Sequence, residues 1–224
     1  ALDDTKFYPD KGRERIKAMI ETRPDWCVSR QRVWGVPLPI FIQKKTKEIL
    51  VDDEVNENIA KIYEKEGSDC WFSDDPQRFL GKKYKAEDYE KLQDIVEVWF
   101  DSGCTHSFVL EKRKDLQWPA SMYLEGSDQH RGWFHSSLLE SCGTRGRAPY
   151  ESILSHGFVV DGKGLKMSKS LGNVIAPEDI LKKYGADILR IWVASSNYAE
   201  DLRIDYSILE QHADSYRKIR NTFR

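Results

Sequence analysis

The fold is decided by the stretch Met122-Tyr123-Leu124-Glu125-Gly126-Ser127-Asp128-Gln129-His130, in which a short apolar strand runs directly into a cluster of polar residues. A helix with one apolar side is predicted for residues 130–141, and another strand at Ile153 and Leu154. Strand, polar loop, helix and strand are the repeating unit of an α/β fold with a doubly wound parallel sheet. Ligands of such sheets bind at the carboxyl ends of the strands, so the polar cluster after Leu124 is a candidate site.

The pattern outside this unit predicts further strands and helices. Two more strands are predicted at residues 95–100 and 158–160. Residues 36–95 are interpreted as an inserted mixed α+β module, with strands at 40–42 and 48–51 and then a helix that contains Val55 and Ile59. Residues 1–9 are predicted to be irregular. The remaining helices are predicted at residues 12–22, 177–184 and 186–195, and from residue 206 onward.

Residues 161–173 predict a second feature, a loop that binds phosphate. Glycines flank the run Lys166-Met167-Ser168-Lys169-Ser170, so the backbone can move while the two ammonium groups close on an anion. This composition is typical of a mobile phosphate clamp. For such a run in isolation, a solvated lysine-rich turn is the alternative.

The composition of the 224 residues, 40% hydrophobic and 32% charged, indicates a soluble globular protein. No apolar run approaches the length of a membrane span, and the N-terminus has no signal-peptide pattern. A cytoplasmic protein without a membrane partner is therefore predicted. The four cysteines form no Cys-x-x-Cys pair and no His-Glu-x-x-His motif occurs, so no protein-bound metal, zinc included, is predicted.

Charge is unevenly distributed along the chain, although the formal net charge is only -2. Residues 11–47 contain ten lysines and arginines against three acidic residues, whereas residues 48–97 contain fifteen acidic residues and seven basic ones. A basic face suits a polyanion such as RNA. Ordinary surface charge is the alternative.

Three motifs resemble those of the class I aminoacyl-tRNA synthetases. The run at residues 166–170 matches that family's Lys-Met-Ser-Lys-Ser signature at all five positions. Residues 29–37 are similar to the segment that follows the editing insertion in the isoleucyl, leucyl and valyl branches. Residues 123–134, together with 99–102 and 156–158, resemble the isoleucyl branch more closely than the other two.

The resemblance implies a ligase that uses ATP, accompanied by Mg²⁺, to activate isoleucine as isoleucyl-adenylate and transfer it to tRNA(Ile). It also implies the second half of a Rossmann-like sheet in a monomeric parent protein. A valyl or leucyl enzyme and a non-catalytic RNA-binding module remain alternatives. The resemblance also implies four parts. Residues 1–35 would be the segment that re-enters the catalytic domain after the editing insertion, and residues 36–95 an insertion module. Residues 96–204 would be the second half of the catalytic domain with the Lys-Met-Ser-Lys-Ser loop, and residues 205–224 the start of a helical anticodon-binding domain.

The same resemblance implies the site residues, and chemistry agrees with it. Carboxylates accept hydrogen bonds from ribose hydroxyls and attract an ammonium group, and a glycine lets the backbone approach closely. The implied roles are ribose contacts by Glu125, Gly126 and Asp128; an ammonium contact by Gln129; adenine contacts by His156, Gly157 and Phe158; walls of an isoleucine pocket by Trp99 and Trp133; and catalytic phosphate contacts by Lys166 and Lys169. Alternatively, Asp128 and His130 belong to a helix cap, Trp99 and Trp133 are plain core, and His156 is a hydrogen-bonded histidine that contacts no ligand.

The family's other signature, His-Ile-Gly-His, does not occur in this sequence. Half of the nucleotide site is therefore expected in another part of a longer protein, since a Rossmann-type site lies between two halves of the sheet. The chain on its own is expected to fold without activating isoleucine. The predicted last helix has no capping residue at its end, which is typical of a fragment.

Overall fold

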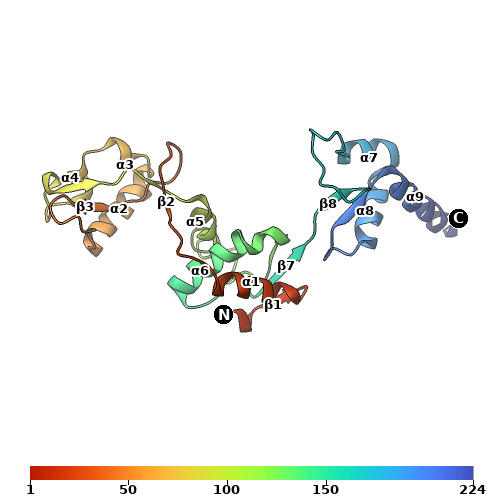
Figure 1. Cartoon of the computed structure of the whole chain (residues 1–224), viewed down its shortest axis with the longest axis horizontal. Coiled ribbons are helices and arrows are strands. Elements are labelled where there is room, and N and C mark those ends of the chain that lie inside the picture. The colour runs from red at the N-terminus through yellow and green to blue at the C-terminus, as the bar shows by residue number, and fades with distance from the viewer. Residues whose placement is uncertain (224) are drawn as a thin grey trace.

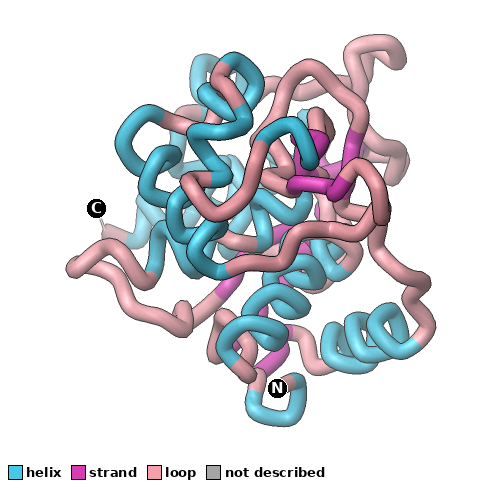
Figure 2. Tube along the Cα trace, turned by 90° about the vertical axis from the view of Figure 1, so that its left-hand side faces the viewer, coloured by secondary structure: helices cyan, strands magenta, loops and turns pink. Residues whose placement is uncertain are grey.

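The computed structural model describes residues 1–223 as an elongated molecule of three bodies, each built around its own apolar cluster (Figure 1). The central body contains the N-terminus, the body with residues 41–89 lies to its left in the figure, and the body with residues 159–222 lies to its right. Viewed from the left-hand end, the strands are short segments among helices (Figure 2). Within residues 1–223, no helix combines the length and the apolar character that crossing a lipid bilayer requires.

A three-stranded parallel sheet forms the centre of the molecule. Its strands are, in spatial order, β1 (Lys6–Tyr8), β7 (Ser152–His156) and β6 (Tyr123–Gly126). Phe7 and Tyr123 both lie opposite Ile153, and all three side chains are buried in one cluster. The prediction that residues 1–9 are irregular is wrong, because a three-residue strand with one inward side chain leaves almost no periodic signal.

Helix α6 (Trp133–Arg145) connects β6 to β7, which confirms the predicted strand–helix–strand unit. Phe134 and Leu138, four residues apart, lie on one side of the helix and are buried in the central cluster. Gly146 ends the helix with φ of 72°, a left-handed conformation that glycine adopts without a steric penalty. Helix α1 (Lys11–Glu21) packs against the same cluster through Ile16.

The prediction of a strand over residues 95–100 is correct only for Ile95 and Val96 and is wrong for the rest of that range. Three short elements occupy or join this region: β2 (Ser29–Arg30), β5 (Ile95–Val96) and α5 (Val98–Gly103). β5 pairs with β2 in antiparallel orientation, and Ile95 also forms an isolated antiparallel bridge with Pro37. The Glu97 carboxylate then accepts a hydrogen bond from Trp99 N at 3.1 Å, so it caps a helix. The aromatic and β-branched composition favours a strand, but this local cap decides for α5.

The left-hand body has a core of its own. It contains β3 (Phe41–Gln43), α2 (Asp53–Glu66), α3 (Cys70–Ser73), α4 (Pro76–Leu80) and β4 (Tyr89–Lys91). The ring centroids of Trp71 and Phe79, both fully buried, lie 5.0 Å apart at its centre. The helix predicted after residue 51 is confirmed as α2. The strand predicted at 48–51 is shorter in the structure: Ile49 forms one bridge with Ile42 of β3, flanked by the hydrogen bonds from Gln43 N to Glu48 O and from Leu50 N to Phe41 O, while β4 also pairs with β3.

The right-hand body contains the predicted C-terminal helices. Its elements are β8 (Val159–Asp161), α7 (Pro177–Tyr184), α8 (Ala186–Ser195), β9 (Leu202–Ile204) and α9 (Tyr206–Thr222). The strand predicted at 158–160 exists as β8, but it pairs with β9 and not with the central sheet. The short helical turns of the chain are η1 (Leu2–Asp4), η2 (Ala86–Asp88), η3 (His106–Leu110) and η4 (Ser127–His130).

Candidate functional site

The carboxyl ends of β6 and β7 place three predicted site residues next to one another. In the parallel register, Glu125 lies opposite Ser155, and Gly126 lies opposite His156. Glu125 is exposed, whereas Gly126 is buried. The Glu125 carboxylate is therefore open to a ligand beside a backbone position that carries no side chain.

Gly126 lies where two other site residues approach the sheet. A Cβ atom at this position would be 2.8 Å from Asp128 Oδ1 and 3.4 Å from the Phe158 ring, so the close approach requires glycine. Asp128 lies in the turn η4, where its Oδ2 accepts a hydrogen bond from Gln129 Nε2 at 3.3 Å. The structure thus brings Gly126, Asp128, Gln129 and Phe158 together.

Gln129 begins a second group, which includes both predicted indoles. Its Oε1 accepts a hydrogen bond from Trp133 N at 2.9 Å, so Gln129 and not Asp128 bonds to the first N–H of α6. A Cβ atom on Gly132 would be 2.3 Å from Gln129 Oε1 and 3.0 Å from the Trp99 ring. Gln129 and Trp99 therefore lie against the same glycine, directly before Trp133.

The two indoles have different surroundings. Trp133 stacks on Tyr123 with ring centroids 3.9 Å apart and an interplanar angle of 6°, and its Nε1 donates to Ser102 O at 3.0 Å. Trp99, on the first turn of α5, is 42% exposed. Trp133 is thus partly a core residue, as the alternative reading holds, whereas Trp99 presents an open face.

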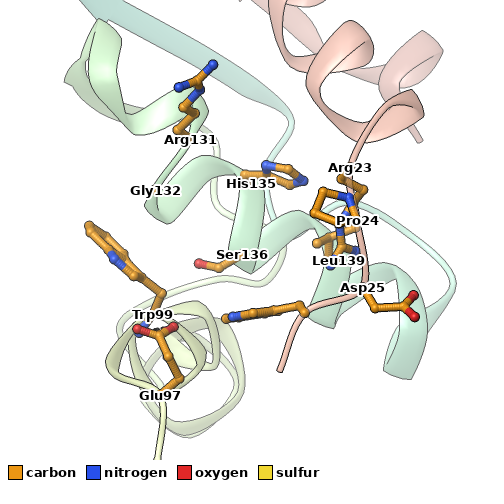
Figure 3. A pocket seen from close by; sticks show the side chains of 11 residues that line it. Arg23, Pro24, Asp25, Glu97, Trp99, Arg131, Gly132, His135, Ser136 and Leu139 are labelled. Carbon is orange, nitrogen blue, oxygen red and sulfur yellow. Dashed lines mark hydrogen bonds between the residues drawn. The ribbon is translucent and has the colours of Figure 1, made fainter. Parts of the chain in front are cut away.

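A pocket of about 220 Å³ lies beside Trp99 (Figure 3). Its lining comes from α5, from the start of α6 and from the segment after α1: Glu97, Trp99, Arg131, Gly132, His135, Ser136, Leu139, Arg23, Pro24, Asp25 and Trp26. Burial, and then the nearby Arg23, lowers the pKa of His135, which favours its neutral imidazole. Sequence reasoning missed Glu97, Arg131 and His135, because three distant segments form this pocket and no single motif contains them.

The predicted adenine residues lie where the central body joins the right-hand one. His156 Nδ1 is 2.7 Å from Gly157 O, which can only accept, so Nδ1 donates and Nε2 is left as an acceptor. Gly157 N donates to Tyr198 O at 2.9 Å, and a Cβ atom on Gly157 would be 2.2 Å from Glu200 O. Only glycine fits this crossing of two chain segments, and the exposed Phe158 ring follows it.

The lysine loop is fixed by one carboxylate and one amide at its base. Asp161 Oδ1 accepts hydrogen bonds from Lys163 N at 3.0 Å and Leu165 N at 2.8 Å, and Asp161 Oδ2 accepts from Asn173 Nδ2 at 2.8 Å. Asn173 Oδ1 in turn accepts from Ser168 N at 2.9 Å. The amide of Asn173, followed by the Leu165 N–H, lowers the pKa of the Asp161 carboxyl. The two ends of the loop are thereby joined by charge-assisted bonds.

Lys166 and Lys169 are both exposed beyond this base. Within residues 1–223, neither forms an ion pair, and no hydrogen bond links either one to Glu125, Gln129 or the indoles. The structure therefore brings together, in the central body, the residues predicted to contact the ribose, the ammonium group and the isoleucine side chain. The two lysines lie on a separate loop, which follows β8 in the right-hand body (Figure 1).

The family described as tRNA synthetases class I (I, L, M and V) matches residues 1–205. The chain belongs to this family. One relative of this class I synthetase segment, the isoleucine–tRNA ligase of Pelagibacter ubique (strain HTCC1062), is 95% identical over 224 residues, which are 100% of this chain and 25% of that protein. The isoleucine–tRNA ligase of Brucella abortus biovar 1 (strain 9-941) is 57% identical over 225 residues, with coverage of 100% and 23%. The synthetase segment thus spans about a quarter of the length of these curated relatives.

Two solved structures are similar to the segment in fold. The ternary complex of Agrobacterium radiobacter K84 agnB2 LeuRS with tRNA and LeuAMS has a TM-score of 0.61 at 21% identity, over 93% of this chain and 30% of that one. Mycobacterium tuberculosis methionyl-tRNA synthetase in complex with methionyl-adenylate has a TM-score of 0.60 at 17% identity, over 96% and 33%. This likeness confirms the α/β fold class that the sequence predicts.

Proposed function

We propose that this segment belongs to an enzyme that uses ATP to convert isoleucine to isoleucyl-adenylate and then transfers the isoleucyl group to tRNA(Ile). The observation that carries the proposal is the 95% identity, over the whole segment, to an isoleucine–tRNA ligase. The placement of Glu125, Gln129 and Trp99 near the carboxyl end of β6 supports it, because parallel sheets bind ligands there. The activity is proposed for the whole protein, of which this chain is a segment. Within the segment, residues 1–35 are proposed as the part that follows the editing insertion and 36–95 as an inserted module. Residues 96–204 are proposed as the second half of the catalytic domain and 205–224 as the start of the anticodon-binding domain.

The proposed activation step is a displacement at phosphorus. The isoleucine carboxylate forms a bond to the α-phosphorus of ATP, and the bond to pyrophosphate breaks. Negative charge builds on the leaving pyrophosphate, where the exposed ammonium groups of Lys166 and Lys169 supply charge-assisted hydrogen bonds. Mg²⁺ is proposed to accompany ATP in this step. Among residues 1–223, no three His, Cys, Asp or Glu side chains gather closely enough to hold a metal ion.

The nucleoside is proposed to lie over the ends of β6 and β7. Glu125 and Asp128 are exposed carboxylates that can accept hydrogen bonds from the two ribose hydroxyls, and buried Gly126 lets the sugar approach. His156 Nε2 and the backbone of Gly157 offer polar contacts to adenine, and the Phe158 ring, 47% exposed, offers a stacking face.

The amino acid is proposed to lie between Gln129 and the indoles. The amide oxygen of Gln129 has two lone pairs and bonds to one backbone N–H, so it can also accept from an ammonium group. The open face of Trp99 supplies apolar surface to a branched aliphatic side chain. The same proposal assigns Trp133 to the opposite wall of the isoleucine pocket.

Pyrophosphate exchange with the full-length protein tests the proposal. Isotope from labelled pyrophosphate should enter ATP when isoleucine is added, and much more slowly with valine or leucine. Faster exchange with valine or leucine would transfer the assignment to that enzyme. No exchange with any of the three would exclude an enzyme that activates isoleucine, valine or leucine. Size-exclusion chromatography with light scattering and cell fractionation would test the further proposal of a cytoplasmic monomer.

Non-catalytic RNA binding is the second candidate, and one observation favours it. Trp34 is 90% exposed, and it lines a hollow of about 1010 Å³ together with Arg30 and Arg32. Cationic side chains beside an exposed indole suit single-stranded RNA, since bases stack on aromatic rings. Binding of tRNA that weakens after Trp34→Ala, in a protein that shows no exchange, would favour this candidate.

A further inference from the structure

Helix α6 contacts the end of α5 through three side chains on one face. Trp133 Nε1 donates to Ser102 O at 3.0 Å, Ser137 Oγ donates to Gly103 O at 3.0 Å, and Cys104 Sγ donates to Glu140 Oε2 at 3.0 Å. Residues 133, 137 and 140 follow the i, i+4, i+7 spacing of a helix face. Three consecutive positions of the α5 segment, 102 to 104, are therefore held by one stripe of α6.

The contact is close as well as polar. Ser137 has no exposed surface, and a Cβ atom on buried Gly103 would be 2.2 Å from Glu140 Oε1. Gly103 O also lies 3.0 Å from His106 Nδ1, so this carbonyl has two partners. Small residues at 103 and 137 thus bring the two helices together, and the hydrogen bonds fix the register between them.

The Glu140 carboxyl is an unusual group to find between two helices. Its Oε1 is buried and, within the described residues, has no hydrogen-bond partner. Burial raises the pKa of Glu140 to about 7, with a further contribution from Asp101. A buried polar group of this kind costs folding free energy, so its role is not explained by stability alone.

The geometry connects this stripe to the pocket wall. Helix α5 has only six residues; Trp99 lies in its first turn and Gly103 at its end, one helical turn away. At the other end of the stripe, Trp133 is fixed by Ser102 O and Tyr123. A shift of α5 along α6 would therefore change the distance between the two indoles.

We propose that Ser137 and Glu140 are positioning residues that fix α5 against α6 and thereby set the spacing of Trp99 and Trp133 for a branched aliphatic amino acid. This inference rests on the proposed function. It predicts selectivity effects from two residues that are themselves outside the lining of the pocket beside Trp99. An amino-acid pocket needs walls held within fractions of an ångström to discriminate side chains that differ by one methylene.

The test uses the full-length protein and amino-acid-dependent pyrophosphate exchange. Ser137→Ala and Glu140→Ala should each raise the KM for isoleucine by about tenfold and lower the isoleucine-to-valine ratio of kcat/KM, while the KM for ATP changes less than about twofold. Glu140→Gln keeps the shape and an oxygen acceptor for the Cys104 thiol, so it should restore most of the selectivity. Thr144→Ala is the matched control on α6, because the exposed Thr144 hydroxyl, among residues 1–223, bonds only to the backbone Glu140 O of its own helix.

The outcomes separate the two proposals. If the unsubstituted full-length protein shows no isoleucine-dependent pyrophosphate exchange, the proposed function is overturned, and this inference with it. An active parent whose Ser137→Ala and Glu140→Ala variants keep the isoleucine KM and the selectivity overturns the positioning role alone. Equal losses for isoleucine and ATP would also overturn it, since they indicate general damage to folding. If Glu140→Ala does not fold, Ser137→Ala and Cys104→Ala each remove one hydrogen bond of the stripe and decide the matter.

Discussion

The indole group and the lysine loop are held in contrasting ways. Gln129, Trp99 and Trp133 are fixed by a backbone hydrogen bond, by a ring stacked on Tyr123 and by close packing against Gly132. The lysine loop is tied at its base by Asp161 and Asn173, and the side chains of its two signature lysines are exposed. One region is preorganised in the structure, and the other is open.

This difference matches two chemical tasks of the proposed reaction. Selection of a side chain by shape requires walls that are in place before the ligand arrives. Stabilisation of a leaving pyrophosphate requires contacts that strengthen in the transition state and then release the product. The contrast therefore predicts that changes in the loop alter kcat, and that changes in the central body alter binding.

The largest effect is expected from the loop. Lys169→Ala in the full-length protein should lower kcat for pyrophosphate exchange by about 10²-fold, because its ammonium group is proposed to contact charge that develops on the leaving group. The KM for isoleucine should hardly change. Lys182→Ala, an exposed lysine on α7, is the matched control and should behave like the parent. An unchanged kcat for Lys169→Ala would remove the loop from the reaction and with it the contrast between the regions.

The next effect is expected at the end of β6. Glu125→Ala should weaken binding of a non-hydrolysable isoleucyl-adenylate analogue by about 1.5–3 kcal/mol, the usual range for hydrogen bonds to a charged group. Calorimetric titration measures this loss, and Glu151→Ala, at the amino end of β7, is the control. Because Glu125 is exposed, the melting temperature should change little. Normal analogue binding with a large loss of stability would indicate a structural role for Glu125 instead.

A smaller effect is expected from the base of the loop. Asn173→Ala removes the bonds to Asp161 Oδ2 and Ser168 N, so the lysines lose a fixed base while keeping their charge. The expected result is a decrease in kcat of about tenfold, as for loss of orientation without loss of the reacting group. Asn221→Ala, at the exposed end of α9, is the control. A decrease in kcat as large as that of Lys169→Ala would show that the anchoring of the loop by Asn173 contributes as much to kcat as the Lys169 charge does.

The sequence predicts the parts of the fold that have a long periodic pattern. Helix α6 and the C-terminal helices have caps or apolar spacing over two or more turns, and the structure confirms them. The sequence predicts the structure poorly where a single contact determines whether a segment forms a helix or a strand, or which sheet it joins. The Glu97 cap converts a strand-like run into α5, and Gly157 leads the chain out of the central sheet before β8. Such decisions depend on a single partner, which a periodic pattern does not show.

The site is predictable to the extent that one motif contains it. Gly126, Asp128, Gln129 and Trp133 lie in one stretch, so the sequence places them together. The pocket beside Trp99 and the stripe of Ser137 and Glu140 were not predictable, because each joins segments 30 or more residues apart.

The smallest effect is a pH dependence confined to the contact between α5 and α6. The titratable groups that face Glu140 are Asp101 and Cys104 of the α5 segment, while Arg145 on its own helix pairs with Glu111 at 2.9 Å. Burial raises the pKa of Glu140 from 4.5 to about 7, so the folded protein binds its proton more tightly than the unfolded chain does. The contribution of this bound proton to the stability of the folded protein is therefore complete below pH 4.5. It decreases as the pH rises from 4.5 to about 7, and it is absent above that.

Hydrogen exchange of the α5 and α6 amides, followed by mass spectrometry, measures this local stability. The parent protein and Glu140→Gln should be compared at the same pH, so that the intrinsic exchange rate cancels. The protection of the parent relative to the variant should decrease between pH 5 and pH 8, because only the parent loses a proton from this contact. Amides of α2, in the left-hand body, serve as the internal control. A ratio that stays constant over this range would mean that Glu140 is ionised throughout, and that the contact between α5 and α6 does not raise its pKa.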